Sequence, residues 1–221
     1  MTPMESLEVY PQKQRKRRPA RARRRRTQAE RSTQTRQLLL SAAIDLICET
    51  GFFDLTLARV AQRAGVSRGA VQHHFGTRAE LLLALISDFS PDYLNKLEVP
   101  KRASLETSVD AIINHFWALY QHKQAQAVFH LWLGARSDPE LQPMLSGTMR
   151  AFEKEMDRRW SDIFADRNLP QAQISAARRI TLAALRGFAT YLKDGAAWRK
   201  ELLLLKKMLV AILSKPERDF A

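Results

Sequence analysis

Residues 57–75 read LARVAQRAGVSRGAVQHHF, and this stretch decides the fold. The pattern predicts two short helices joined by a tight turn at Gly65. Two helices can pack at a steep angle across such a turn when a small residue, here Ala61, lies inside it and an apolar residue, here Val66, follows the glycine. The spacing therefore predicts a helix-turn-helix, whose second helix can enter the major groove of duplex DNA.

Helix signals continue on both sides of this motif. Thr27 and Glu30 have capping-box spacing before an apolar stripe that ends at Gly51, and Thr77 and Glu80 repeat that spacing after the motif. Gly and Pro are scarce, at 8 and 9 of 221 residues, and no useful run alternates as a strand would. The sequence therefore predicts an all-α fold of about nine helices. The expected helices span about 28–50, 57–64, 68–74, 78 to a bend or end near Pro91, 104–121, 124–136, 139–165 in one or two pieces, 170–193 and 197–214.

The formal net charge of +13 is concentrated at the N-terminus. Residues 1–26 hold ten Lys/Arg against two acids, whereas residues 27–90 hold six of each. Such an arm is expected to be disordered alone and to bind polyanions, although it could instead be a solvated tail. We divide the chain into a basic arm over 1–26, a helix-turn-helix head over 27–76 and a helical body over 77–221, for which we expect ligand binding and dimerisation.

Cys48 is the single cysteine, which excludes an intrachain disulfide and a cysteine-based metal cage. We expect a reducing compartment, with no metal and no cofactor. The paired arginines of the arm could suggest an export signal, but the first apolar stretch after them contains Asp45 and Glu49. No window of about 18 apolar residues exists, so no transmembrane helix is expected.

A series of residues in and around the motif occurs in a characteristic order and spacing: Ala42-Ala43, Gly51-Phe52, Thr56, Ala64-Gly65-Val66-Ser67, Gly69, His74-Phe75, Arg78 and Leu81. Over about residues 30–90 the chain thereby resembles the TetR family of transcriptional regulators. The resemblance implies a DNA-binding regulator in the bacterial cytoplasm, associated with the nucleoid. We expect a repressor released from a palindromic operator by a small apolar or aromatic effector. The chain departs from the family pattern at Ala70, usually threonine, and at Gln72, usually a tyrosine that holds a phosphate.

Chemistry and resemblance together suggest the DNA contacts. Hydroxyls and free amides at helix starts suit phosphates, arginines suit phosphate or guanine, and the small Gly69 and Ala70 let the helix approach the bases. Gln72 could donate a hydrogen bond to a phosphate or read an adenine base. Arg68 could instead be a solvated surface residue. Phe75 fits packing in the core better than contact with DNA. The predicted DNA-binding residues are Arg23, Arg24, Arg25, Arg26, Thr56, Ser67, Arg68, Gly69, Ala70, Gln72, His73, His74 and Arg78.

Large soft side chains are frequent between residues 104 and 165. Most would fill a helical core, but some could line a cavity between helices for an apolar or aromatic effector. Arg136 could bind a carboxylate of that effector, or pair with Asp138 or Glu140. The predicted ligand-binding residues are Phe89, Tyr93, His115, Phe116, Leu119, Trp132, Arg136, Met149 and Phe152.

The two last predicted helices each carry an apolar stripe. Small residues within the first stripe would allow close approach, so two copies could pair these helices as a four-helix bundle. A homodimer would also place two recognition helices on one face of the DNA. The stripe could instead be core within one chain. The predicted dimer residues are Ile174, Ala177, Thr181, Ala184, Leu185, Phe188, Leu192, Trp198, Leu202, Leu205, Leu209 and Ile212.

Other classes of protein fit the sequence less well. An enzyme is disfavoured because we find no nucleophile elbow, phosphate-binding glycine loop, paired catalytic carboxylates or Cys/His dyad. An architectural DNA binder that uses the basic arm without a ligand remains an alternative, as does an activator on the same fold.

Overall fold

The computed structural model describes residues 27–100, 102–191 and 198–216, with the backbone alone described in 90–95. This part of the chain has no strands, which confirms the predicted all-α fold. Its helices are α1 (Gln28–Thr50), α2 (Leu57–Ala64), α3 (Arg68–His74), α4 (Arg78–Asn95), α5 (Leu105–Tyr120), α6 (Lys123–Ala135), α7 (Leu141–Ile163), a 3-10 turn η1 (Ala165–Arg167), α8 (Gln171–Tyr191) and α9 (Trp198–Leu213). The predicted site residues Arg23, Arg24, Arg25, Arg26 and Leu192, and the side chain of Tyr93, lie outside the described residues.

The ends of α1 follow from local chemistry. The Thr27 hydroxyl accepts a hydrogen bond from the Glu30 amide at 3.2 Å, and the Glu30 carboxylate accepts one from the Thr27 amide at 2.8 Å. This is the predicted capping box. At the other end Gly51 adopts a φ of 86°, which a side chain would disfavour. The helix therefore begins and ends where the sequence predicts.

The start of α4 uses its capping residues differently. The Glu80 amide donates to the Thr77 hydroxyl at 3.1 Å, but the Glu80 carboxylate accepts from the Gly76 amide at 2.8 Å rather than from Thr77. The helix then continues past Pro91 to Asn95, so of the two expectations, a bend or an end near Pro91, the end is corrected. A proline removes one amide donor from the helix it lies in, and here the helix continues for four more residues.

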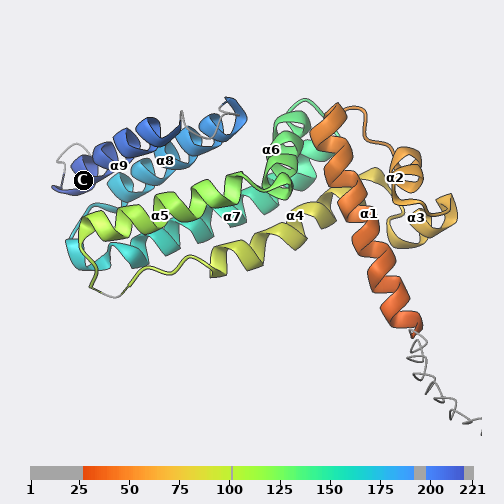
Figure 1. Cartoon of the computed structure of the whole chain (residues 1–221), viewed down its shortest axis with the longest axis horizontal. Helices are drawn as coiled ribbons and strands as arrows, with labels where there is room; N and C mark the ends of the chain where they lie inside the picture. The colour runs from red at the N-terminus through yellow and green to blue at the C-terminus, as the bar shows by residue number, and fades with distance from the viewer. Residues whose placement is uncertain (1–26, 101, 192–197, 217–221) are drawn as a thin grey trace, which may run out of the picture.

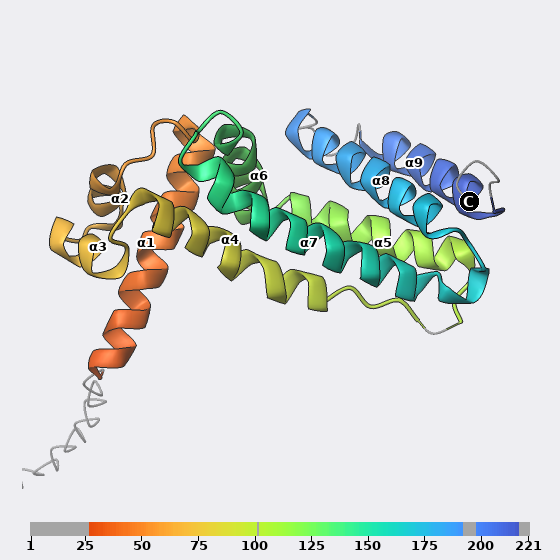
Figure 2. The ribbon, with the colours of Figure 1, turned by 180° about the vertical axis from the view of Figure 1, so that it is seen from behind.

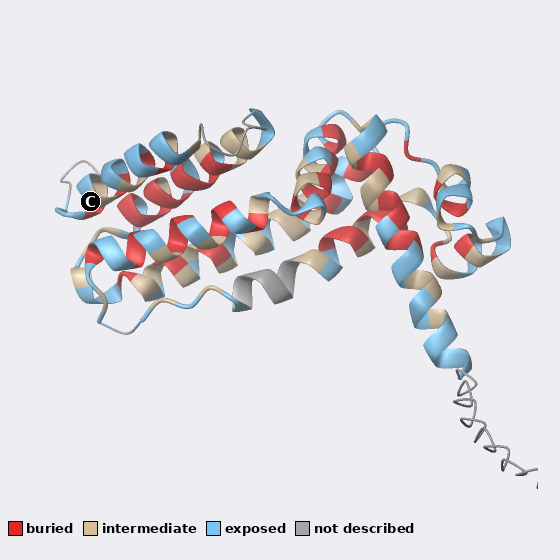
Figure 3. Cartoon of the chain, viewed as in Figure 1, coloured by how far each residue is buried: buried red, intermediate tan, exposed pale blue. Residues whose placement is uncertain are grey.

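The helices form an elongated molecule with α2 and α3 at one end and the α8–α9 pair toward the other (Figure 1). Helix α4 leaves the head and runs beside α7 into the body, as the view from behind shows (Figure 2). Helices α5, α7, α8 and α9 pack lengthwise, and α6 lies between them and the head. Buried residues line the facing sides of these helices (Figure 3).

Two hydrophobic clusters hold this arrangement together. The first joins α1, α2, α3 and the start of α4 to α6 and the start of α7. The second joins α5, the later part of α7, α8 and α9. The core of the head therefore does not stop at residue 76: Ala127, Val128 and Leu131 of α6 belong to it. A body helix thus packs directly on the DNA-binding motif.

The predicted dimer stripe faces the chain's own core. Six of its residues are buried in the second cluster, namely Ile174, Ala177, Leu185, Leu202, Leu205 and Leu209, and Thr181 is buried at 1% exposure. Four more pack against that cluster while partly buried: Ala184, Phe188, Trp198 and Ile212. For the seven buried residues the assignment to a dimer surface is therefore corrected, because an amphipathic helix turns its main apolar stripe to its own core first. For the four partly buried residues the assignment stays a prediction.

Gln173 joins α8 to the end of α9. Its side chain is 0% exposed, and its Nε2 donates to the Ile212 and Lys215 carbonyl oxygens at 2.5 and 2.9 Å. These carbonyls lie at the C-terminus of a helix, where backbone acceptors lack intrahelical partners.

Replacing Gln173 by alanine is expected to lower the free energy of unfolding by about 1–3 kcal/mol, because buried acceptors lose their donor. Urea unfolding measures this change. The control is Gln142→Ala on the exposed side of α7, for which a change within about 0.5 kcal/mol is expected. Equal effects of the two substitutions would show that the Gln173 bonds contribute nothing.

Candidate nucleic-acid interface and ligand cavity

The turn between α2 and α3 is built around Gly65. Its φ of 67° and ψ of 31° are left-handed, which glycine adopts without steric cost. The Val66 amide donates to the Ala61 carbonyl at 3.1 Å, and the Gly65 amide donates to the Gln62 carbonyl at 3.2 Å. This pair of bonds is a Schellman motif, which ends α2 and sends the chain directly into α3.

Hydroxyl groups begin both helices of the motif. Thr56 accepts from the Arg59 amide, and Ser67 accepts from the Ala70 amide, each at 3.2 Å. As acceptors, the two hydroxyls keep their own protons, and both residues are exposed. Each can therefore donate to a DNA phosphate while it caps its helix.

The exposed face of α3 brings together most of the predicted DNA contacts. Ser67, Arg68, Gly69, Gln72 and His73 are exposed, and Ala70 is half-buried. In the described part of the chain, the Arg68 guanidinium has no carboxylate within ion-pair distance. Its charge is thus available to an outside acceptor.

Buried residues fix the opposite face of α3. Val71 and Phe75 both lie in the first hydrophobic cluster. Phe75 therefore belongs to the core, as predicted from the sequence. Arg36 of α1 lies over the Phe75 ring at 5.7 Å and pairs with Asp88 of α4 at 2.7 Å. The orientation of α3 is therefore held by packing on one side while the other side stays open.

The end of α3 carries polar groups with internal contacts. The Gln72 amide nitrogen donates to the Gly76 carbonyl at 3.0 Å, which leaves the Gln72 side-chain oxygen as an acceptor. His74 is half-buried, and burial, then the nearby charges of His73 and Arg36, lower its pKa. His74 is therefore neutral at neutral pH and can serve DNA as a hydrogen-bond donor rather than as a cation.

Arg78 does not face DNA, contrary to the prediction. Its Nε donates to the Leu55 carbonyl and its Nη2 to the Phe52 carbonyl, both at 2.9 Å. Its Nη1 lies 3.3 Å from the Asp138 carboxylate, and the guanidinium lies 4.3 Å from the centre of the Phe52 ring. The assignment of Arg78 to a phosphate is corrected, because all three nitrogens are already bound within the protein.

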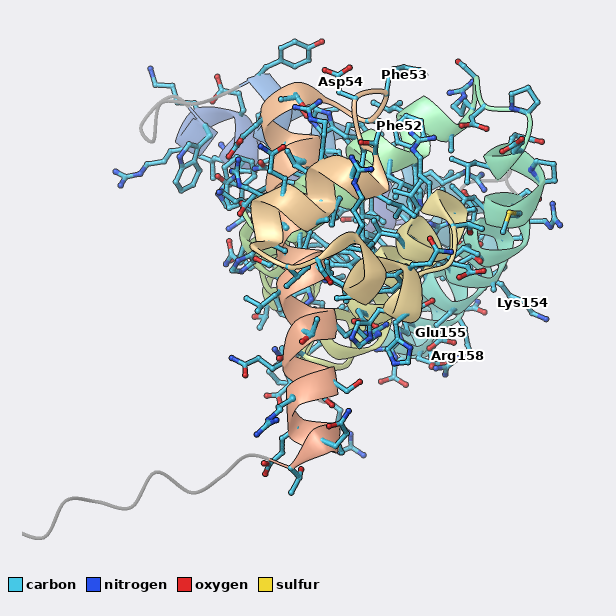
Figure 4. The ribbon with its side chains drawn as sticks, turned by 90° about the vertical axis from the view of Figure 1, so that its right-hand side faces the viewer. Phe52, Phe53, Asp54, Lys154, Glu155 and Arg158 are labelled. Carbon is cyan, nitrogen blue, oxygen red and sulfur yellow. The ribbon has the colours of Figure 1, made fainter. Side chains whose placement is uncertain are left out.

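Arg78 is part of a head–body junction, which we define as Phe52, Arg78, Gly134 and Asp138. Figure 4 views the molecule from the head end and labels Phe52 in the turn between α1 and α2. The Phe52 ring lies against Gly134 of α6, where a Cβ atom would fall 2.2 Å from a ring carbon. Asp138 also accepts from the Glu140 and Leu141 amides at the start of α7, each at 3.1 Å. Direct contacts at this junction therefore join α6 and the start of α7 to the head.

A cavity of about 290 Å³ lies in the body between α4, α5, α6, α7 and α8. Six of the predicted ligand residues line it: Phe89, Phe116, Leu119, Trp132, Met149 and Phe152. His115 does not line it, and Arg136 is exposed beside a separate groove next to Trp132. The assignments of His115 and Arg136 to the cavity are therefore corrected, because helix rotation turns both side chains away from it.

The sequence interpretation missed the contribution of α8 to this wall. Arg178, Arg179 and Arg186 line the cavity, as do Leu182 and Ala183 of the same helix. Arg178, Leu182 and Arg186 are spaced at i, i+4 and i+8, which places them on one helix face. That spacing is a sequence signal for a basic cavity wall. Assigning the neighbouring apolar stripe of α8 to a dimer surface draws attention away from it.

The described residues contain neither a metal-ligand cluster nor a membrane-spanning helix. Among them no group of three or more His, Cys, Asp or Glu side chains could hold a metal ion. No helix within the described ranges is both long enough and apolar enough to span a membrane.

The fold and its two sites define a class of protein: a helix-turn-helix DNA-binding head joined to a helical body with an internal cavity. Residues 39–85 match the sequence family described as bacterial regulatory proteins, tetR family. The chain is 30% identical over 148 residues to the HTH-type transcriptional regulator BetI of Escherichia coli strain UMN026, covering 64% of this chain and 73% of that protein. The chain therefore belongs to the TetR family and is a DNA-binding transcriptional regulator.

Two further similarities extend over most of the chain. The HTH-type transcriptional regulator CymR of Pseudomonas putida is 27% identical over 178 residues, which cover 79% of this chain and 85% of CymR. The crystal structure of NalD, the secondary repressor of the MexAB-OprM multidrug efflux pump in Pseudomonas aeruginosa, superposes with a TM-score of 0.62. That match covers 81% of this chain and 96% of NalD. Because the identity is only 21%, the match shows a shared fold and nothing more specific.

Proposed function

We propose that this chain is a repressor that binds a palindromic operator as a homodimer and leaves it when a small apolar or aromatic effector fills the cavity. One observation carries the proposal: α6 belongs to both sites. Val128 of α6 lines the cavity and also lies in the core of the head, and Trp132 lines the cavity and packs against that core. An effector that shifts α6 must therefore shift the head.

The mechanism is a linkage between two equilibria. The free protein holds its two heads at a spacing that fits successive major grooves, and the effector stabilises a different spacing. The effector can weaken DNA binding only by the ratio of its affinities for the two arrangements. The name of NalD, a repressor of similar fold, supports repression over activation. The protein would act in the cytoplasm, where the operator lies.

A footprint on the DNA around its own gene tests this function. We expect one discrete protected site with two half-sites about one helical turn, or a multiple of it, apart. Uniform protection along the DNA would contradict the proposal and favour an architectural role. A reporter gene downstream of the protected site then separates repression from activation, since loss of the protein should raise its expression.

The homodimer in this proposal uses the outer faces of α8 and α9 rather than the buried stripe. Large apolar side chains remain exposed there: Ile180, Tyr191, Leu203, Leu204 and Met208. On α8 the small residues Ala183 and Gly187 lie on the same helix face as Ile180 and Tyr191, since the spacing is close to whole turns. Small residues between exposed apolar ones allow two helices to approach closely, as a four-helix bundle of two copies requires.

Replacing Gly187 by arginine is expected to convert the dimer to a monomer at micromolar concentration. No atom lies within 4 Å of a Cβ at this position, so the monomer can accept the side chain. The added charge would lie in the interface and lose its hydration there. Light scattering after size exclusion measures the mass.

The matched control is Gly147→Arg on α7, because a Cβ at Gly147 also meets nothing within 4 Å and the position is exposed. It should remain dimeric. A Gly187→Arg protein with the mass of a dimer would place the interface elsewhere.

A further inference from the structure

The cavity is not uniformly apolar. Its wall includes three arginines of α8, Arg178, Arg179 and Arg186, and one acid of α7, Glu153. The other lining residues are mainly aromatic and aliphatic. A site intended only for a neutral apolar molecule would not need these charges, since each costs desolvation when a ligand covers it. The partners of each charge therefore indicate which ligand charge the cavity accepts.

Arg178 is already neutralised. Its Nε donates to the Asp157 carboxylate at 2.8 Å, and its side chain is only 5% exposed. Burial would raise the pKa of Asp157, but hydrogen bonds from Arg178 and Ser175 outweigh it, so that the pKa is lowered overall. Asp157 thus stays ionised and paired, and Arg178 has no charge to spare for a ligand.

Arg186 lacks a carboxylate partner. Its Nε donates to the Leu182 carbonyl at 3.1 Å within α8, and its guanidinium lies 5.7 Å from the centre of the Phe129 ring. Among the described residues no acid lies within 4 Å of it, and its Nη groups make no hydrogen bond. A half-buried guanidinium whose two Nη groups make no hydrogen bond is well suited to bind a planar carboxylate through two parallel hydrogen bonds.

Tyr120 of α5 supplies a second donor to the same wall. Burial raises the pKa of Tyr120 to about 12, although the charges of Arg186 and Arg178 act in the opposite direction. The phenol is therefore protonated at neutral pH, and its hydroxyl has no hydrogen-bond partner in the described part of the chain. A protonated phenol beside an arginine favours an anion over a cation.

The remaining charges lie at the rim. Arg179 and Glu153 are both exposed, and neither has an ion pair in the described part of the chain. Because their charges are opposite and screened by water, these two residues have little influence on which ligand charge the cavity accepts. The uncompensated charge inside the cavity is that of Arg186.

We propose that the effector is an amphipathic anion, with an aromatic or aliphatic body against Phe116, Trp132 and Phe152 and one carboxylate bound by Arg186 and Tyr120. This inference rests on the proposed function, since it names the chemistry of the effector at the same cavity. The ligand carboxylate supplies the negative charge that balances Arg186, for which the described residues offer no carboxylate partner. The apolar body then gains from burial against the aromatic wall.

Calorimetric titration of the full-length protein with matched probes tests the charge. The probes are phenylbutyrate, its neutral amide phenylbutyramide and the cationic phenylbutylamine, with naphthoate and naphthamide as a second body. We expect each acid to bind at least about tenfold more tightly than its amide, and the amine to bind most weakly.

Arg186→Gln should weaken binding of the acids by about tenfold to a hundredfold and leave binding of the amides within about twofold. Arg136→Gln is the control, because Arg136 lies outside the cavity, and it should change neither. Thermal melting verifies that both variants are folded.

Acids that bind no better than their amides, acids that do not bind at all, or an Arg186→Gln protein with unchanged acid affinity would each overturn the inference. These failures differ from failure of the proposed function. If the amide or the amine binds and releases DNA, the cavity is still an effector site and only the anionic charge is wrong. If DNA recognition itself is absent, the proposed function fails.

Discussion

Gly69→Leu is expected to abolish specific DNA binding, with a loss of affinity of about a hundredfold or more, while the protein stays folded. A Cβ at Gly69 would meet only the Ser67 hydroxyl oxygen, at 3.9 Å, which is an ordinary contact. Leucine also favours a helix over glycine by roughly 0.8 kcal/mol. The substitution therefore costs the free protein little. Its side chain would instead project from the exposed face of α3, into the space that the bases must occupy.

Fluorescence anisotropy with the duplex protected in the footprint measures the effect of Gly69→Leu. Gly147→Leu on α7 is the matched control, since its Cβ is equally unobstructed but lies far from α3 in the sequence and on a body helix. The control should bind with the affinity of the parent protein. If Gly69→Leu bound within a few-fold of the parent, α3 would not approach the bases as we describe.

Gly134→Ala is expected to lower the free energy of unfolding by about 3 kcal/mol, which is large for the addition of one methyl group. The new Cβ would lie 2.2, 2.5 and 2.9 Å from the Cδ1, Cγ and Cβ atoms of Phe52. Phe52 cannot swing away cheaply, because its ring is buried and lies 4.3 Å from the Arg78 guanidinium. The strain must therefore separate α6 from the head or distort the turn that holds Phe52.

Thermal unfolding of three variants tests the Gly134 contact. Gly134→Ala should lower Tm by roughly 5–10 °C. Gly147→Ala should keep or slightly raise Tm, because alanine is the better helix former. The double variant Gly134→Ala with Phe52→Leu should recover part of the loss, since leucine lacks the ring atoms that clash. A Gly134→Ala protein as stable as Gly147→Ala would show that the head and α6 are not in contact at this point.

The head could be predicted closely because its signals are local. Thr27, Thr56 and Ser67 are helix caps that act within three residues, and Gly65 determines a turn by its own backbone freedom. Such signals are present in the sequence whatever the rest of the chain does. The bounds of α1, α2 and α3 therefore agree with the prediction.

The destinations of long side chains could not be predicted in the same way. Arg78 occupies a position at a helix start that suits a phosphate, but its guanidinium reaches carbonyls 23 and 26 residues earlier in the chain. Arg186 lies beside the apolar stripe of its helix, and its place in a cavity depends on how α5, α6 and α7 pack around α8. These outcomes depend on tertiary packing, which spacing along one helix does not contain.

Which apolar face of α8 and α9 meets a partner also could not be predicted from the sequence alone. Both helices carry two apolar faces, one built around Leu185 and Leu209 and one around Ile180 and Met208. Periodicity detects the stronger face, and the stronger face is the one that the chain buries for itself. The weaker exposed face, with its smaller residues, is the better candidate for a partner.

The most direct test of the central claim is selection of duplexes by the full-length protein from a library of random sequence. The account predicts enrichment of one inverted repeat, and predicts that Arg68→Ala relaxes the preference at one position of each half-site while Gly69→Leu removes all enrichment. Recovery of no preferred sequence, or an unchanged motif with Gly69→Leu, would contradict the claim that α3 reads DNA.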